Sequence, residues 1–206
     1  MLKKEFQFEK EFEELENGKF GNYEDVSYFG IKNDDTGELR QQVKVLYYNS
    51  KNDFAIKLIT KQEDEVILCK NPKGTTFNEI YENIKDEENT YDGNKTLEEE
   101  EIVKIPNIKL KEKNEFYDLE NKLFYFSNNK SFYIEKAIQT IEFELDKTGG
   151  KVKSEAGMMF LKEAAAIEPE EKREFLLDDT FAIYLIEEGK DNPYFAAEIN
   201  DITKFQ

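Results

Sequence analysis

The side chains that most often perform catalysis are scarce in this sequence. It has no histidine and a single cysteine, Cys69, among 206 residues. Without histidine, neither a Ser-His-Asp triad nor a Cys-His pair can form, and most zinc sites lose a ligand. Cys69 follows the apolar residues Val66–Leu68, so we expect a buried structural thiol rather than a reactive one. The sequence therefore predicts a protein that is not an enzyme and uses no cofactor. Assays on generic ester and glycoside substrates would test that expectation.

Acidic residues dominate the charge, which is −17 at pH 7. Phosphate groups are bound mainly by Lys and Arg, so this balance argues against nucleic acid and anionic membranes as partners. The acidic run Glu98–Glu101 lacks the spaced ligands of a calcium or magnesium site, and we predict no metal there. No apolar run approaches the roughly 20 residues of a membrane span. The first residues also lack a signal-peptide segment. As written, the chain is expected to be soluble and cytoplasmic. An upstream signal would make it extracellular, so the compartment stays open.

A long segment of small and charged residues separates two hydrophobic regions near the C-terminus. Ile141, Phe143 and Leu145 alternate with acidic residues, a pattern typical of a half-buried strand, and Gly149 and Gly150 follow. Residues 151–173 show no lasting periodicity. An exposed loop of this length in a compact fold is uncommon and usually functional. After the loop we predict three short, deeply buried strands at residues 175–177, 181–186 and 194–199, with a turn at residues 188–193.

The first half of the chain predicts mainly strands. A turn is expected at Asn17–Phe20, before a strand through Val26 and Ile31. Alternating apolar positions then indicate a three-strand meander, whose first strand should place one set of side chains on a common face. That set is Leu39, Gln41, Val43, Val45 and Tyr47. The second and third strands are expected at residues 54–58 and 66–69.

One amphipathic helix is predicted after the meander. Thr76 and Glu79 have the spacing of a capping box, and apolar residues follow at helical spacing from Phe77 to Ile84. We expect this stripe to pack in the core and residues 85–101 to form a polar loop. Residues 102–110 then read as a strand interrupted by Pro106, which requires a bulge or an edge position.

The order of these segments and their amino-acid sequences resemble the C-terminal half of the serpins. FELDKTGG stands where that family has its hinge strand, EAGMMFLKEA lies in the loop, and REFLLDDTFAIYLIEEGKDNPYFAAEI stands where the closing strands are expected. IVKIPNIKL resembles a proline-containing serpin strand, and YDLENKLF resembles the start of the next serpin helix. The resemblance implies one serpin-like domain over residues 1–206. It implies an α+β fold with mixed β-sheets and few helices, lacking the N-terminal helical half.

The family resemblance also implies a function for the loop at about residues 149–173. In serpins, a protease cleaves this reactive-centre loop, is trapped as an acyl-enzyme, and the loop inserts into the large β-sheet. Counting about fourteen residues past Gly149 places the cleaved bond near Glu163–Ala164. The implied reactive-bond candidates are Glu163, Ala164, Ala165 and Ala166. The implied hinge residues are Gly149, Gly150, Lys151, Val152, Lys153 and Ser154.

Two functions stay open at this stage. The first is inhibition of a serine or cysteine protease through loop insertion, which the small or apolar residues at alternate hinge positions favour. The second is a non-inhibitory or truncated serpin homologue that serves as a binding or structural module. The hinge favours this second function where Lys151–Lys153 replace the small residues of inhibitory members. With half of a serpin present, we expect the large sheet to keep an open edge, which self-association or a partner chain would complete.

Overall fold

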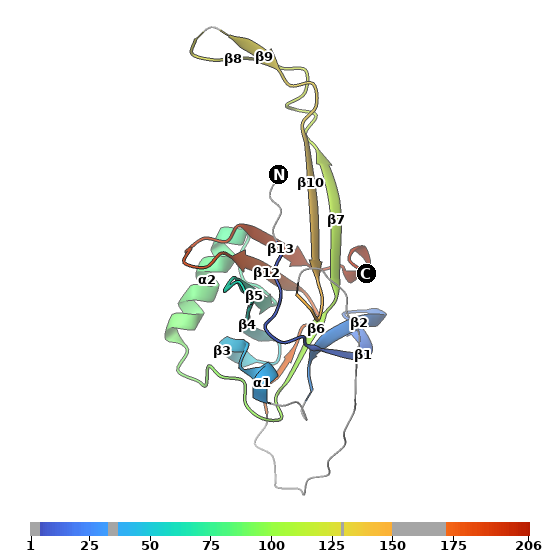
Figure 1. Ribbon diagram of the computed structural model, residues 1–206, viewed down its shortest axis with the longest axis vertical. Helices are drawn as coiled ribbons and strands as arrows, with labels where there is room; N and C mark the ends of the chain where they lie inside the picture. The colour runs from blue at the N-terminus through green and yellow to red at the C-terminus, as the bar shows by residue number, and fades with distance from the viewer. Residues whose placement is uncertain (1–4, 33–36, 129, 150–171) are drawn as a thin grey trace, which may run out of the picture.

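The computed structural model describes residues 5–32, 37–128, 130–149 and 172–206. Within these ranges the chain forms thirteen β-strands in four sheets, two α-helices and one 3-10 helix. The predicted α+β class, with mixed sheets and few helices, is confirmed. Two larger sheets pack against each other, and a two-stranded ribbon runs out of this body to a small hairpin (Figure 1).

The largest sheet has five antiparallel strands and contains the predicted meander. Tyr194–Ile199 was expected to be deeply buried, but β13 is an edge strand and most of it is only partly buried. The spatial order is β13 (Phe195–Ile199), β12 (Phe181–Ile186), β5 (Glu65–Lys70), β4 (Asp53–Ile59) and β3 (Val43–Ser50).

The first strand of the meander differs from its prediction at both ends. Leu39 lies in the short helix α1 (Gly37–Arg40), and β3 begins only at Val43. A register shift between Val45 and Tyr47 then turns Tyr47 away from the face that Val45 occupies. Because a bulge adds one residue, it breaks the two-residue periodicity on which the shared face depended.

The second sheet has four strands in the order β1 (Glu13–Phe20), β2 (Tyr23–Ile31), β6 (Ile102–Pro106) and β11 (Glu174–Leu176). Its last pair, β6 and β11, is parallel. The turn expected at Asn17–Phe20 is wrong, because β1 continues through Gly18 with two register shifts. The chain turns instead at Gly21 and Asn22, where Gly21 adopts a φ of 54°.

A long ribbon is formed by β7 (Ile108–Glu115) and β10 (Ile138–Leu145), which pair in register over eight residues. β6 ends at Pro106, and Asn107 separates it from β7, so the strand is interrupted one residue after the predicted position. Phe143 and Leu145 are buried on one face of β10, which confirms the alternation seen in the sequence.

The helix expected to begin at Tyr117 does not form. Hydrogen-bonded turns lead instead into a hairpin of β8 (Leu123–Tyr125) and β9 (Ser131–Tyr133). Asn121 adopts a φ of 56°, a left-handed conformation that interrupts an α-helix.

Helix α2 (Phe77–Thr90) covers one face of the five-stranded sheet, and its N-cap is the predicted one. The Thr76 hydroxyl accepts a hydrogen bond from the backbone of Glu79 at 3.2 Å. The Glu79 carboxylate accepts the reciprocal bond from Thr75 at 2.9 Å, one residue earlier than in a standard capping box. The loop predicted from Lys85 is wrong as far as Thr90, because the helix continues to that residue.

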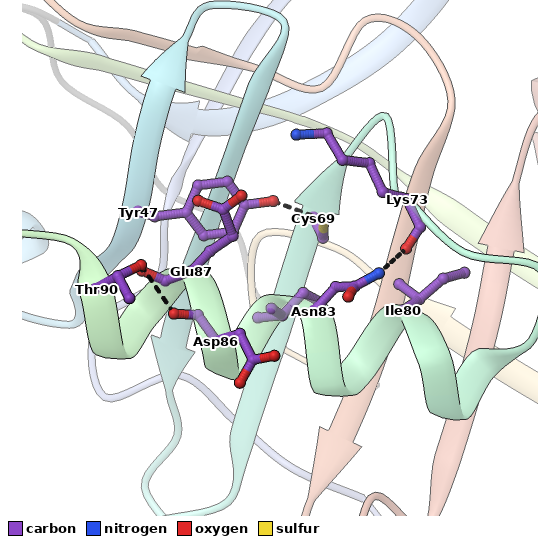
Figure 2. A pocket seen from close by; sticks show the side chains of 9 residues that line it. Tyr47, Cys69, Lys73, Ile80, Asn83, Asp86, Glu87 and Thr90 are labelled. Atoms are coloured by element: carbon purple, nitrogen blue, oxygen red, sulfur yellow. Dashed lines mark hydrogen bonds between the residues drawn. The ribbon is translucent and has the colours of Figure 1, made fainter.

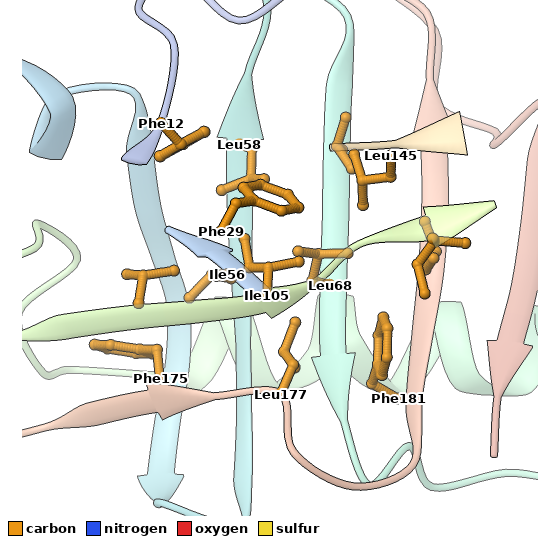
Figure 3. Close-up of a cluster of buried hydrophobic side chains, with 14 of the residues drawn as sticks. Phe12, Phe29, Ile56, Leu58, Leu68, Ile105, Leu145, Phe175, Leu177 and Phe181 are labelled. Carbon is orange, nitrogen blue, oxygen red and sulfur yellow. The ribbon is translucent and has the colours of Figure 1, made fainter. Parts of the chain in front are cut away.

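The core has two layers, one on each face of the five-stranded sheet. Figure 3 shows the larger layer, where strands of the two sheets cross and their apolar side chains meet. Phe29, Ile105 and Phe175 come from the four-stranded sheet, and Ile56 and Leu68 from the five-stranded sheet. The smaller layer lies between that sheet and α2. The C-terminal 3-10 helix η1 (Ile202–Lys204) packs beside β2.

Candidate functional site

The predicted loop is held at its N-terminal end by a tight turn after β10. The backbone N–H groups of Asp146 and Gly149 each donate to the other residue's carbonyl, at 3.2 and 3.1 Å. The Asp146 carboxylate accepts from the Thr148 backbone at 2.8 Å and from the Thr148 hydroxyl at 2.6 Å. Such side-chain acceptance of a backbone N–H two residues later is a standard way to close a turn. The turn reverses the chain direction at Gly149.

Gly149 also pairs with a segment from the start of the chain. It forms antiparallel bridges to both Asp146 and Gln7, so it lies between the end of β10 and the N-terminal segment. Phe8 N–H donates to the carbonyl of Thr148 at 3.1 Å, and Phe12 N–H donates to that of Lys147 at 2.9 Å. Residues 5–12 therefore pack along the turn that ends at Gly149.

The N-terminal segment is itself anchored in the core. Phe6, Phe8 and Phe12 are buried, and the rings of Phe8 and Phe12 pack edge to face with centroids 4.8 Å apart. Lys61 N–H donates to the Gln7 carbonyl at 2.7 Å, which links the segment to the turn between β4 and β5. The turn at Asp146–Gly149 is thus connected, through residues 5–12, to both the core and the five-stranded sheet.

Only glycine fits at position 149. Gly149 has a φ of 116°, and a Cβ placed there would lie 2.6 Å from the carbonyl oxygen of Phe6. Both the backbone conformation and the close approach of the neighbouring chain exclude a side chain.

The first residues described after the predicted loop are held by a largely buried ion pair. Arg173 donates to both carboxylate oxygens of Glu101, at 2.6 and 2.9 Å. Its other hydrogen bonds go to the backbone carbonyls of Asn94 and Thr96, at 2.6 and 2.9 Å, and to the Tyr91 hydroxyl at 3.2 Å. Burial lowers the pKa of Arg173, but the hydrogen bonds and charge of Glu101 outweigh it, so the net shift is upward.

A second arginine, Arg40, holds the backbone of Glu101 in place. Arg40 is buried and donates to the carbonyls of Glu98 and Glu101, at 2.7 and 2.6 Å. The Glu101 carboxylate also accepts from the Glu98 backbone at 2.7 Å. Residues 91–101 are therefore fixed between two arginines, immediately beside the residue that ends the loop.

The structure brings together only part of the predicted site. Gly149 lies in the turn after β10, and the segment between Gly149 and Lys172 lies outside the described residues. That segment contains these predicted residues: Gly150, Lys151, Val152, Lys153, Ser154, Glu163, Ala164, Ala165 and Ala166.

Sequence reasoning missed Arg173, Glu101 and the Phe6–Phe12 segment. Glu101 stands in a run of four glutamates that look alike in sequence, and only the fold buries the last one. A usable signal was the position of Glu101 directly before the apolar strand β6. For Phe6–Phe12, three phenylalanines among charged residues indicated burial but not where.

A cavity of about 310 Å³ lies between α2 and strands β3 and β5 (Figure 2). The Tyr47 hydroxyl and the Cys69 thiol meet at its edge, 3.4 Å apart. Cys69 is buried, as predicted, and burial raises the pKa of its thiol to about 11. A thiol that stays protonated at neutral pH is a poor nucleophile, so this cavity does not indicate covalent catalysis.

The described ranges contain neither a cluster of metal ligands nor a membrane-spanning helix. Among these residues, no group of three or more acidic or cysteine side chains is arranged to hold a metal ion. None of the helices in the same ranges is long and apolar enough to cross a bilayer.

Comparisons of sequence give no assignment. No family model matches the chain. No curated protein matches it either.

Solved structures do match. Serpin48 from the insect Tenebrio molitor aligns with 94% of this chain at a TM-score of 0.54 and 12% identity. Human thyroxine-binding globulin aligns with 94% at a TM-score of 0.58 and 9% identity. A serpin from the trematode Schistosoma haematobium aligns with 96% at a TM-score of 0.57 and 13% identity. The chain spans about half of the length of these proteins, at 52%, 52% and 54% respectively. At such low identity the likeness concerns the fold, and that fold is the one formed by the C-terminal half of a serpin.

Proposed function

We propose that this chain carries the bait loop of a serpin-type protease inhibitor. The loop extends over about residues 149–173, and a serine or cysteine protease cleaves it near Glu163–Ala164 or at Ala165 or Ala166. The freed N-terminal arm of the loop then adds to the sheet beside β10. Small residues at the cleavage point suit an elastase- or subtilisin-like enzyme, and Glu163 suits a Glu-specific one.

The position of Gly149 carries this proposal. The hinge glycine already lies between the end of β10 and the N-terminal segment, paired antiparallel to Asp146 and to Gln7. A strand that continues from this point would run antiparallel to β10. The turn at Asp146–Gly149 supplies the reversal that such a strand needs.

The pairing of β10 supports the same step. In the part of the chain that the structure describes, β10 has β7 as its only strand partner. An added strand would satisfy the N–H and C=O groups of the other edge, and each net hydrogen bond contributes about 0.5–1.5 kcal/mol. Insertion would first require the backbone hydrogen bonds from Phe8 to Thr148 and from Phe12 to Lys147 to break. Displacing residues 5–12 would therefore set the energy barrier for insertion.

A second candidate is a binding module whose loop does not insert. Two observations favour it: residues 5–12 hold the hinge closed, and the cavity beside α2 could receive a small molecule. Thyroxine-binding globulin, a protein of related fold, is described in complex with thyroxine.

Incubation with an elastase-like, a subtilisin-like and a Glu-specific protease separates the two candidates. An inhibitor should give a protease complex that survives SDS, with a cleavage site between residues 163 and 166. A binding module should give cleavage alone.

A matched pair of variants sharpens this experiment. In an inserted strand starting at Gly149, Ser154 would face the core and Glu155 the solvent. We expect Ser154→Arg to abolish the complex while leaving cleavage intact, and Glu155→Arg to preserve both. Equal behaviour of the two variants would contradict insertion.

A further inference from the structure

We propose that residues 116–138, here named the aromatic tip, form a docking surface for a second copy of this chain. Eleven large hydrophobic side chains are exposed in the described residues, and nine of them lie in the tip. Tyr125, Tyr117 and Tyr133 are the most exposed of the nine, at 71%, 69% and 61%. An exposed apolar patch this concentrated is typical of an interaction surface.

The tip has little support from the rest of the molecule. Figure 1 shows β8 and β9 at the far end of the β7–β10 ribbon, away from both larger sheets. The two strands form only three residue pairs, and Phe132 packs on Phe124 and Phe126 with ring centroids 5.4 and 4.9 Å apart. An isolated two-stranded hairpin is marginally stable in water, so a packing partner would stabilise the tip.

The size of the patch suits a dimer. A large aromatic side chain covers about 150–250 Å², and the nine side chains are exposed by 41–71%. Together they expose on the order of 900 Å², but the hairpin register divides them between two faces, so one face offers the smaller area of a weak, reversible interface.

Charge favours a second copy as the occupant. The whole chain carries −17, but the tip has three lysines and three acidic residues and is neutral. Two copies repel each other over most of their surface and can approach most easily at the tip. The tip charges are Asp118, Glu120, Lys122, Lys130, Glu135 and Lys136.

Two of the tip lysines, Lys122 and Lys130, are available for pairing between copies. Lys136 already acts on Glu115, whose pKa is lowered by Lys113 and, less strongly, by Lys136. Lys111 of the neighbouring ribbon pairs with Glu142 at 2.8 Å within the same chain. The ribbon charges are therefore paired within the chain, and the tip offers exposed charges of both signs around an aromatic centre. This inference does not depend on what the loop does.

Sedimentation of the full chain over a range of concentrations tests the proposal. We expect a reversible dimer with a Kd on the order of 1–100 µM. The triple variant Tyr117→Ser, Tyr125→Ser and Tyr133→Ser should bind at least about tenfold more weakly. The matched control, Tyr23→Ser with Phe77→Ser, removes the two exposed aromatics outside the tip and should leave the Kd unchanged. Circular dichroism of each variant confirms that the fold is kept.

Variants with reversed charges test whether the tips of two copies contact each other. Lys122→Glu with Lys130→Glu should weaken dimers of that variant, and so should Asp118→Lys with Glu135→Lys. Mixing the two variants should restore association as a heterodimer. An Asn128→Cys variant should form a disulfide-linked dimer. A monomer at all concentrations, a dimer unaffected by the triple variant, or association only with an unrelated protein would overturn the proposal.

Discussion

At the scale of single residues, Gly149 is the position on which the turn after β10 depends. Gly149→Ala places a Cβ 2.6 Å from the Phe6 carbonyl oxygen and forces a φ of 116° on a residue with a side chain. We expect the free energy of unfolding to fall by about 1–3 kcal/mol. Urea denaturation measures this, and residues 5–12 should exchange amide hydrogens faster in the variant.

Gly189→Ala is the matched control for that measurement. Gly189 has a φ of 68°, but no atom lies within 4 Å of its added Cβ. Gly189→Ala should lower the free energy of unfolding by only roughly 1 kcal/mol, the cost of a left-handed conformation for a residue with a side chain. It should leave amide hydrogen exchange at residues 5–12 unchanged. Equal effects at the two glycines would show that the contact with Phe6 is unimportant.

Cys69 makes the stability depend on alkaline pH. Burial, opposed by the smaller effect of the hydrogen bond with Tyr47, raises the pKa of the folded thiol to about 11 from an ordinary value of 9.0. The folded state therefore holds a proton that the unfolded state releases first. The stabilisation is fully present below about pH 8.5 and is lost as the pH rises towards 11, by up to about 3 kcal/mol.

Urea denaturation at roughly pH 8 and pH 10.5 checks this effect. Buried tyrosines such as Tyr47 have raised pKa values from the same cause and add to the slope. The Cys69→Ala variant isolates the thiol, because it should lose less stability than the natural chain between the two pH values. Identical losses would contradict a buried, protonated thiol.

At the scale of elements, the ion pair of Arg173 and Glu101 connects the residue before β11 to the residue before β6. Glu101 is 3% exposed, so Glu101→Ala leaves the guanidinium without its charged partner in a largely buried site. We expect a loss of about 3 kcal/mol in unfolding free energy. Proteolysis at residues 172–176 should also become faster.

The neighbouring residue provides the control. Glu100 pairs with Lys172, but both side chains are well exposed. Glu100→Ala should therefore change stability by less than about 1 kcal/mol. A similar loss in both variants would mean that the Glu101 ion pair does not hold β11.

Elements with strict periodicity were predictable, and elements shaped by distant contacts were not. β10 and α2 follow from alternation and from a capped apolar stripe. The sequence predicts a turn at Gly18 because glycine usually marks one. In the structure its missing side chain makes room for Lys104, whose ammonium group lies 4.4 Å from the centre of the Tyr28 ring. Lys104 is 86 positions away in sequence, so local pattern could not reveal this role.

In the candidate site, too, local sequence patterns predict some features, and contacts between distant residues determine the others. Gly149 was identified because a glycine after a hydrophobic strand is a local signal. Its place between Asp146 and Gln7 depends on residues separated by more than 130 positions. The burial of Glu101 among four adjacent glutamates likewise follows from how β6 and β11 pack, which no short window of sequence contains.

At the scale of the whole molecule, the proposed insertion predicts that cleavage increases stability. Completing the edge of β10 over about eight residues would add on the order of 5 kcal/mol. For a chain of this size, that gain corresponds to a rise in Tm of roughly 10–20 °C. Calorimetry before and after cleavage near residue 164 measures it. A Tm that stays constant or falls would favour the binding module.

The parallel pairing of β6 with β11 has a consequence for how the protein acquires its structure. These strands are about 70 residues apart in sequence, and β6 also pairs with β2 from the first 31 residues. Such contacts require large loops to close before they contribute any stability, and high contact order makes folding slow, typically milliseconds to seconds. Until β11 docks, unpaired backbone and apolar side chains of the four-stranded sheet remain open to aggregation. Renaturation should therefore succeed best from dilute solution.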